Sequence, residues 1–321
     1  MEQLNDKTLK LSKHHLAVFA LIIANLIWGA AAPVFKWSLQ DIEPFTLAFL
    51  RFFIAALILL PFTMHKLHIK KQDWTKLALL SILGITISIS LFFIGLTMSS
   101  SINAPIIGSS APVFIILGSI FFLGEMPKRK VIIGTVTSLI GVLIIVLQPI
   151  IEKGMDGTVI GNLLFIFAMF GGVGHTILLR GLAKSYSALT LTFWSFLIGS
   201  VTFIPMMFGE VQTHGFLTNL SNQGLIGILF GAFLSSALAY YLFNLALKYM
   251  VASEASIFTY MDPIIAILIA VPLLNESITV TYLIGSALVF LGISIAEKRV
   301  HWHPLHKLKL QKLATASPDT V

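Results

Sequence analysis

The fold is decided by two stretches of equal length that lie 151 residues apart. Residues 108–125 read GSSAPVFIILGSIFFLGE and residues 259–276 read TYMDPIIAILIAVPLLNE. Aligned without a gap, they place Pro112 on Pro263. The same shift pairs Leu91-Phe92 with Leu242-Phe243, Leu123 with Leu274, Glu125 with Glu276, Gly134 with Gly285 and Gly141 with Gly292. The chain therefore contains an internal repeat.

A second register, with a shift of 144, covers the beginning of each half. It pairs Ala24 with Ala168, Lys36 with Arg180, Thr46 with Thr190, Phe49 with Phe193 and Pro61 with Pro205. Each half carries five apolar segments, so the second half must insert upside down relative to the first. We therefore predict an all-α membrane protein with ten transmembrane helices, built from two inverted five-helix repeats at 15–150 and 157–297. Many secondary transporters use such repeats to obtain two related conformations around one central site.

The composition is that of a membrane protein. Hydrophobic residues make up 57% of the chain and charged residues 11%, with a mean hydropathy of +0.93, whereas soluble domains carry about 25% charged residues. The apolar runs cover 16–35, 44–63, 76–98, 102–123, 130–150, 158–179, 189–208, 224–247, 252–274 and 279–296. Each is close to the roughly 20 residues that cross about 30 Å of hydrocarbon as a helix. Cysteine is absent, which excludes disulfides and thiolate metal or redox sites.

Basic residues are distributed unevenly between the two sides of the membrane. Ten spans put both termini on one side, which then holds 18 of the 21 lysines and arginines, against Lys36 and Lys153 on the other side. The positive-inside rule predicts a plasma (inner) membrane protein with 1–14 and 298–321 as cytoplasmic tails. The net charge of +7 then reflects topology and contact with anionic lipid, and no nucleic-acid partner is expected. The first run follows a basic stretch, as in a signal peptide, but it is long and its loss would break the repeat, so we interpret it as a retained helix.

Several short motifs occur in order along this pattern. They are Trp28-Gly29 with Lys36, Leu50-Arg51-Phe52, Ala111-Pro112-Val113-Phe114 followed by Gly124-Glu125, and Met261-Asp262-Pro263 followed by Asn275-Glu276. Over residues 15–297 the chain resembles the ten-helix EamA-domain members of the drug/metabolite transporter superfamily. The resemblance implies a permease for small metabolites, often an exporter of amino acids or related compounds. One departure is Asn275, where the first half has Gly124.

Asp262 is the strongest single candidate for a functional residue. It lies about ten residues into its predicted helix, which at roughly 1.5 Å per residue is near the bilayer midplane. An ionisable group there indicates a substrate ligand or a proton carrier. Ala255, Thr259 and Ala266 lie on the same stripe, which would face a cavity or a close neighbour. The alternative is a buried acid that only bonds neighbouring helices. The equivalent residue of the first half is Ala111, so any acid chemistry is asymmetric.

Prolines and glycines create points where the predicted helices can bend. Pro112 and Pro263 lie at the midplane, where proline deprives the carbonyl four residues earlier of its hydrogen bond. We predict that they are conformational hinges, with a static kink as the alternative. His175 follows three glycines within residues 171–174. It can titrate near neutral pH and is a second candidate, with Asp262, for proton coupling, whereas a packing role is the alternative.

Polar and aromatic residues within the spans complete the predicted substrate site. They are Asn25, Trp28, Asn103, Tyr240 and Tyr260, together with Asp262. Trp28 and Tyr260 would offer apolar or π contact to a substrate. The alternative is that these aromatic rings face the protein core or lipid.

Charged residues near the ends of spans favour structural roles. Arg51 lies about seven residues into its span and would suit a substrate carboxylate, but we expect an outer-loop acid, Asp41 or Glu43, as its partner. Lys36 is expected to be an interfacial anchor. Glu276 is expected to satisfy the N-terminus of a helix.

These observations predict a secondary transporter rather than an enzyme. It would move an amino acid or a related compound outward by alternating access about a midplane site. No Walker motif is present, so a proton or substrate gradient would supply the energy, and a facilitator with no coupling stays open. The expected partners are the small-molecule substrate, membrane lipids and protons, with no cofactor or metal ion, and monomer and homodimer both stay open. The alternatives are a multidrug efflux carrier and a membrane-embedded enzyme acting on lipid-linked substrates, which would need clustered acid, His, Arg or Ser groups near one interface.

Overall fold

A computed structural model describes residues 2–111, 114, 129–153, 157–183, 185–215, 220–246, 249 and 256–297. These residues form helices and loops, with no strand among them. Seven of the helical segments are long and apolar enough to span a membrane, and two shorter apolar helices cover Phe258–Leu274 and Val280–Ile295. The predicted span at 102–123 is described only in part. The prediction of an all-α membrane protein is thereby confirmed.

The helices of the two halves follow the same order. The first half contains α1 (Glu2–Ser38), α2 (Pro44–Thr63), the 3-10 turns η1 (Met64–Lys66) and η2 (Lys71–Asp73), α3 (Trp74–Ser81), the π-helix η3 (Ile82–Ile87), α4 (Ser88–Met98), α5 (Asn103–Gly108) and α7 (Arg129–Lys153). The second contains α8 (Gly157–Leu182), α9 (Ala188–His214), α10 (Asn222–Leu229), the π-helix η4 (Phe230–Leu238), α11 (Ala239–Ala246), the 3-10 helix η5 (Ser256–Met261), α13 (Asp262–Leu274) and α14 (Val280–Glu297).

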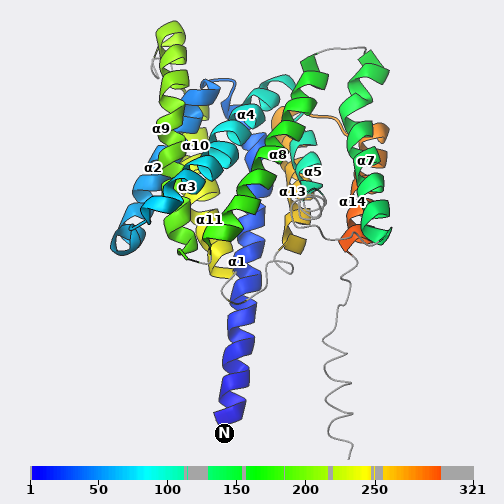
Figure 1. Cartoon of the computed structure of the whole chain (residues 1–321). Helices are drawn as coiled ribbons and strands as arrows, with labels where there is room; N and C mark the ends of the chain where they lie inside the picture. The colour runs from blue at the N-terminus through cyan, green and yellow to red at the C-terminus, as the bar shows by residue number, and fades with distance from the viewer. Residues whose placement is uncertain are drawn as a thin grey trace, which may run out of the picture.

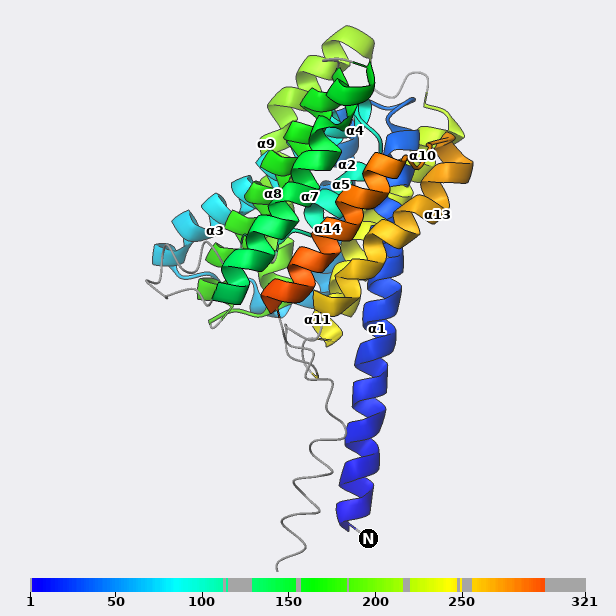
Figure 2. The same ribbon diagram turned by 90° about the vertical axis from the view of Figure 1, so that its right-hand side faces the viewer.

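Corresponding helices of the two halves run in opposite directions. In Figure 1, α1 rises from the N-terminus at the lower end, whereas α8 descends from the upper end; likewise α7 rises and α14 descends. Figure 2 shows that α1 begins below the bundle and that α14 ends at its lower edge, so both ends of the described chain lie on the same side. The inverted arrangement that the repeat predicts is therefore visible in the backbone.

Each half contains a π-helix at the same place in its repeat. A shift of 151 moves η3, at 82–87, to 233–238, which lies inside η4. π-Helical turns are rare, and they frequently occur at functional sites. Because the π-helix occurs at the same place in both halves, we interpret it as a regular part of the repeat rather than a local irregularity.

Small residues allow the closest helix contacts. An added Cβ on Gly292 of α14 would lie 2.3 Å from the backbone nitrogen of Ser138 in α7, and one on Gly141 would lie 2.6 Å from the Gly285 carbonyl oxygen. Close backbone approach of this kind is typical of helices in lipid, where burying large apolar side chains gains little. The α7–α14 pair is therefore held by glycine contacts.

Large apolar side chains cover much of the outer surface. Phe62 is 73% exposed and Leu268 is 65% exposed. Lipid is as apolar as these side chains, so their exposure carries no penalty in a membrane. Inside the bundle, α1 packs against α13, α11 and η4. This central position lets α1 contribute to the candidate site.

Candidate functional site

The second half has a broken helix near the middle of the bundle, and Asp262 lies at the break. The 3-10 helix η5 ends at Met261, and α13 begins at Asp262 with Pro263 in its first turn. Proline is tolerated in the first turn because that position needs no intrahelical N–H bond. Pro263 therefore marks the start of a helix, not a kink within one, and its role as a hinge stays a prediction.

The first half is interrupted at the equivalent place. Helix α5 ends at Gly108, and Ser109 and Ser110 form a turn. A shift of 151 maps these residues onto the last part of η5. Pro112, the other predicted hinge, lies outside the described residues. Discontinuous helices that meet near the bilayer midplane are where secondary transporters build their substrate and ion sites.

Asp262 is partly buried, and one oxygen of its carboxyl group is buried without a hydrogen bond. Its Oδ1 atom has no hydrogen-bond partner among the described residues. Helix α1 packs closely against the backbone at this point, because an added Cβ on Gly29 would be 3.0 Å from the backbone carbonyl oxygen of Asp262 and 2.6 Å from Ile265 Cβ. A buried polar group without a partner is costly and rare in native structures. The free Oδ1 atom therefore needs an explanation, which the prediction of a substrate or proton site would supply.

Trp28 joins α1 to the π-helix of the second half. Its Nε1–H donates to the carbonyl of Ser235 at 3.0 Å. The indole ring stands edge-on to Tyr240, with centroids 5.3 Å apart, and 5.4 Å from the ring of Phe243. The next residue of α1, Gly29, contacts the backbone of Asp262 in α13. Of the predicted site residues, the structure brings Trp28 and Tyr240 into contact.

Arg51 belongs to the same region, although the predicted site omitted it. Its Nε donates to Ser236 Oγ at 2.9 Å, and its Nη2 donates to Ser235 Oγ at 3.1 Å. The guanidinium carbon lies 4.6 Å from the ring centroids of both Phe35 and Phe52. Only 5% of Arg51 is exposed. The sequence did contain a signal that could have placed Arg51 in the site, because it is a charged residue inside an apolar run.

The expected outer-loop partner of Arg51 is used elsewhere. Asp41 Oδ2 accepts the backbone N–H groups of Ser221 and Gly224, both at 2.9 Å, at the start of α10. No carboxylate pairs with Arg51 among the described residues. The prediction of an acidic partner is therefore wrong for Asp41, because a helix N-terminus already binds that carboxylate.

The remaining predicted residues have contacts of their own. Asn25 is fully buried, and its Nδ2 donates to the Leu21 carbonyl of its own helix at 2.8 Å. The Tyr260 ring packs edge-on against Phe290 of α14 at 6.0 Å. Asn103 belongs to a polar group at the upper end of the bundle. Their roles in substrate binding stay predictions.

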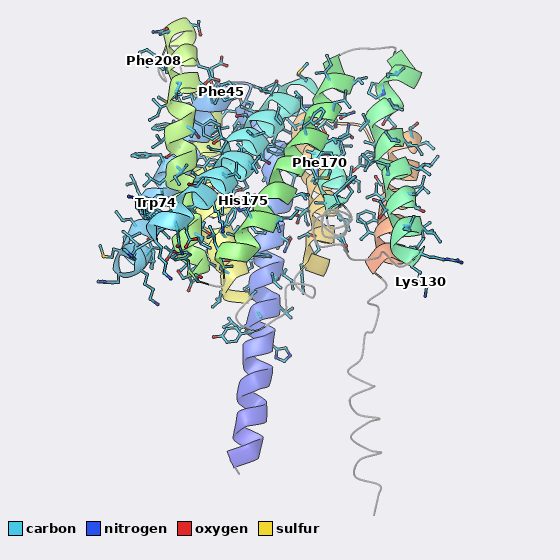
Figure 3. The ribbon with its side chains drawn as sticks, viewed as in Figure 1. Phe45, Trp74, Lys130, Phe170, His175 and Phe208 are labelled. Atoms are coloured by element: carbon cyan, nitrogen blue, oxygen red, sulfur yellow. The ribbon has the colours of Figure 1, made fainter. Side chains whose placement is uncertain are left out.

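His175, the second predicted proton-coupling residue, packs between helices. It lies on α8, as Figure 3 shows, and its Nδ1 is 2.8 Å from the Leu80 carbonyl. A carbonyl can only accept, so Nδ1 must carry the hydrogen. An added Cβ on Gly84 of η3 would lie 2.3 Å from Nδ1, so the glycine makes room for the ring. These contacts favour the packing alternative.

At the upper end of the bundle, Glu276 bonds a helix of the other half. Its carboxylate accepts from Ser100 Oγ at 2.5 Å and from the backbone N–H groups of Ser101 at 2.7 Å and Ile102 at 3.2 Å, just before α5. Lys36 Nζ pairs with it at 2.9 Å. Glu276 therefore accepts hydrogen bonds from the free N–H groups at a helix N-terminus, as predicted. That helix is α5, which belongs to the first half. Lys36, predicted to be an interfacial anchor, is the ion-pair partner of Glu276.

Glu210 and Asp41 make similar contacts at the same end. Glu210 accepts the backbone N–H groups of Phe45 at 2.9 Å and Thr46 at 2.7 Å, at the start of α2. Figure 3 places Phe45 and Phe208 at this upper end and Trp74 and Lys130 at the lower end. Each of these acids joins one half of the chain to the other. A polar cavity of about 350 Å³ adjoins the Glu276 group and is lined by Lys36, Ser99, Asn103, Gln148 and Tyr282 among others.

Replacing Glu276 by Gln should weaken this upper contact. Burial would raise the pKa of Glu276, but hydrogen bonds from Ser100 and Ser101 and the charge of Lys36 outweigh it, so the pKa lies below its ordinary 4.5. A depressed pKa in the folded state means that the carboxylate stabilises the fold fully above pH 4.5 and loses this effect as pH falls through the lowered pKa. Charged hydrogen bonds contribute about 1.5–3 kcal/mol each.

Thermal unfolding of the purified wild type and Glu276→Gln should therefore differ at neutral pH, with the variant less stable. The gap should narrow only when the pH falls below 4.5. Equal unfolding temperatures at neutral pH would show that the contact does not stabilise the protein.

Comparison with known proteins finds matches among membrane transporters. The model of the EamA-like transporter family matches the chain twice, at residues 15–147 and 159–296. An uncharacterized transporter of Archaeoglobus fulgidus is 27% identical over 293 residues, which cover 90% of this chain and 99% of that protein. The uncharacterized transporter YyaM of Bacillus subtilis is 28% identical over 293 residues, covering 88% of this chain and 94% of YyaM.

A solved structure, titled only as the crystal structure of a protein, also resembles the chain. The TM-score is 0.60 at 16% identity, over 89% of this chain and 97% of that chain. At this identity the likeness supports the fold alone.

Proposed function

The chain belongs to the EamA-like transporter family and is a multi-pass membrane transporter, and from that premise we propose that it exports a small metabolite by alternating access about a site at Asp262. The substrate class that we propose is an amino acid or a related compound. Export would be driven by a proton or substrate gradient.

The observation that carries this proposal is the buried carboxyl of Asp262 at a helix break. Its Oδ1 has no hydrogen-bond partner in the part of the chain that the structure describes. Burying an ionisable group within a membrane helix is costly in free energy, so such a group usually indicates a functional site. A carboxyl group there can bind a substrate ammonium group or a transported proton.

Alternating access is supported by how the halves meet. The contacts of Glu276, Glu210 and Asp41 all cross between the halves at the end of the bundle opposite both termini. Helix α1 of the first half packs against α13 and η4 of the second. Rocking of one half against the other would break the contacts of the upper end while changing access to Asp262.

The distribution of charge supports an orientation in the membrane. Most lysines and arginines lie on the side of both termini, and basic loops stay in the cytoplasm. We propose that the termini are cytoplasmic, that the upper end in Figure 1 faces outward and that the protein lies in the plasma membrane.

One observation favours a second candidate, multidrug efflux. The rings of Tyr240 and Phe243 both pack against Trp28, and the same helix, α1, contacts the backbone of Asp262 through Gly29. Aromatic faces and a carboxylate would also bind a lipophilic cation. The same assay separates the two candidates.

The test is transport by purified protein in proteoliposomes, with and without an imposed pH gradient. The probes are radiolabelled amino acids and cationic dyes. We expect saturable, gradient-stimulated flux of amino acids. Flux of the dyes without flux of amino acids would support drug efflux in place of amino-acid export. Protein-free liposomes measure the background leak of each probe.

A further inference from the structure

The connection between α2 and α3 carries a cluster of exposed basic residues. Four lysines lie within residues 66–76, together with a single acid, Asp73. All four lysines are exposed, and we call them the basic patch (Lys66, Lys70, Lys71 and Lys76). Asp73 Oδ2 already accepts the Tyr186 hydroxyl at 2.7 Å. No carboxylate pairs with the basic patch among the residues that the structure describes.

The basic patch lies where two spans end at the membrane surface. One candidate span covers Pro44–Lys66 and the next covers Lys71–Met98, so the lysines are at the level of the lipid headgroups. Figure 3 places Trp74 at the lower end of the bundle, where both ends of the described chain lie. The Trp74 ring stands edge-on to Trp194, with centroids 4.8 Å apart. Tryptophan is enriched at membrane–water interfaces, which agrees with this position.

Helix α9 of the second half fixes the backbone of this connection. Trp194 Nε1–H donates to the Leu67 carbonyl at 3.0 Å, and Thr190 Oγ1 donates to the Lys66 carbonyl at 3.2 Å. Ile69 is buried in an apolar cluster with residues of the second half. These contacts use main-chain groups and one apolar side chain. They therefore order the connection and leave the lysine ammonium groups exposed.

Ordered ammonium groups at this depth fit a negatively charged headgroup layer. Each lysine beside a span strengthens the attraction to anionic lipid by about fivefold. We propose that the basic patch binds the phosphate groups of anionic phospholipids. Lipid phosphates are the anions that lie at this level of the protein's own membrane. The lipid site shares no residue with the proposed export site at Asp262 and does not depend on it.

The test compares two phospholipids that differ in headgroup charge. Purified protein in a neutral detergent is titrated with phosphatidylglycerol, which is anionic, or phosphatidylcholine, which has no net charge, and the thermal unfolding midpoint is measured. A ligand that binds the folded state raises this midpoint. We expect half-maximal stabilisation at about tenfold less phosphatidylglycerol than phosphatidylcholine, since several lysines contribute. In about 1 M salt, where screening acts within ~3 Å, the difference should shrink.

Three double variants locate the preference. Lys70→Gln/Lys71→Gln removes two charges of the basic patch and should raise the required phosphatidylglycerol by at least about fivefold. Lys70→Arg/Lys71→Arg keeps both charges and should match the wild type. Arg129→Gln/Lys130→Gln removes two exposed cations at the start of α7, and Figure 3 shows Lys130 at the same lower end but far from Trp74. This matched control should keep the preference.

Three results would overturn the inference. They are equal stabilisation of the wild type by both lipids, a preference that persists in Lys70→Gln/Lys71→Gln, and an equal loss of preference in Arg129→Gln/Lys130→Gln. Glycerol phosphate, the anionic headgroup without its chains, is titrated as well. An effect equal to that of phosphatidylglycerol would show a site for free anions instead of a lipid surface.

Two further comparisons keep the result clear. If Lys70→Gln/Lys71→Gln is too unstable to measure, the salt dependence of the wild type and of Lys70→Arg/Lys71→Arg decides, and a preference that does not fall with salt would contradict binding through charge. Lipid binding is measured without flux. A protein that prefers phosphatidylglycerol but moves no amino acid would therefore contradict the proposed export alone.

Discussion

Asp262→Asn is expected to reduce substrate flux by about 100-fold, because losing a charged hydrogen bond to the substrate costs roughly 3 kcal/mol. The change keeps the shape of the side chain and removes its ability to carry a proton or pair with an ammonium group. The residual flux should no longer respond to an imposed pH gradient. Uptake into proteoliposomes, measured with and without the gradient, gives both quantities.

The fold should survive this substitution. Oδ1 of Asp262 has no hydrogen-bond partner within the described ranges, so the carboxylate holds no visible structural bond that an amide would break. Asp73→Asn is the matched control: Asp73 lies in η2, and an asparagine there can still accept the hydrogen bond that the Tyr186 hydroxyl donates at 2.7 Å, so this variant should transport normally. A normal gradient response in Asp262→Asn, with folded protein at normal levels, would exclude Asp262 from coupling.

Gly292→Ala is expected to destabilise the protein by about 1–3 kcal/mol, the usual range for overpacking a tight contact. The new Cβ would lie 2.3 Å from the Ser138 nitrogen and 2.5 Å from the Gly134 carbonyl oxygen. Both are backbone atoms, so no side chain can rotate away, and α7 and α14 must separate. The unfolding temperature in detergent and the monodisperse fraction measure the effect.

Gly172→Ala is the matched control for this prediction. It makes the same change within helix α8, where an added Cβ would meet nothing within 4 Å. Alanine favours a helix over glycine by about 1 kcal/mol, so this variant should be as stable as the wild type or more stable. If both variants had the same stability, the glycine contact between α7 and α14 would not be what holds the pair together.

Much of the fold was predictable because hydrophobic length and repetition are local properties of a sequence. A run of about 20 apolar residues needs only to be counted to indicate a span. The odd number of segments per half then dictates the inverted arrangement. The breaks within helices were harder to predict from the sequence. Pro263 suggested a kink, but only the backbone shows a 3-10 segment that ends where α13 begins.

The candidate site was predicted in part. Asp262 stood out because an acid at the midplane is expensive whatever its neighbours. Arg51 and Glu276 were given local explanations, since both lie within reach of loop or helix-end groups along the chain. Their observed partners are far away in sequence: Ser235 and Ser236 for Arg51, and Ser101 for Glu276.

The sequence by itself determined the membrane class, the repeat and the presence of an acid near the midplane, because these depend on composition and spacing along one chain. The tertiary structure decided which groups meet: Trp28 with the π-helical carbonyl of Ser235, Arg51 with hydroxyls instead of an acid, and Glu276 with the other half. The physical reason is that hydrogen bonds act over about 3 Å, and only packing of the two halves brings residues about two hundred positions apart within that distance.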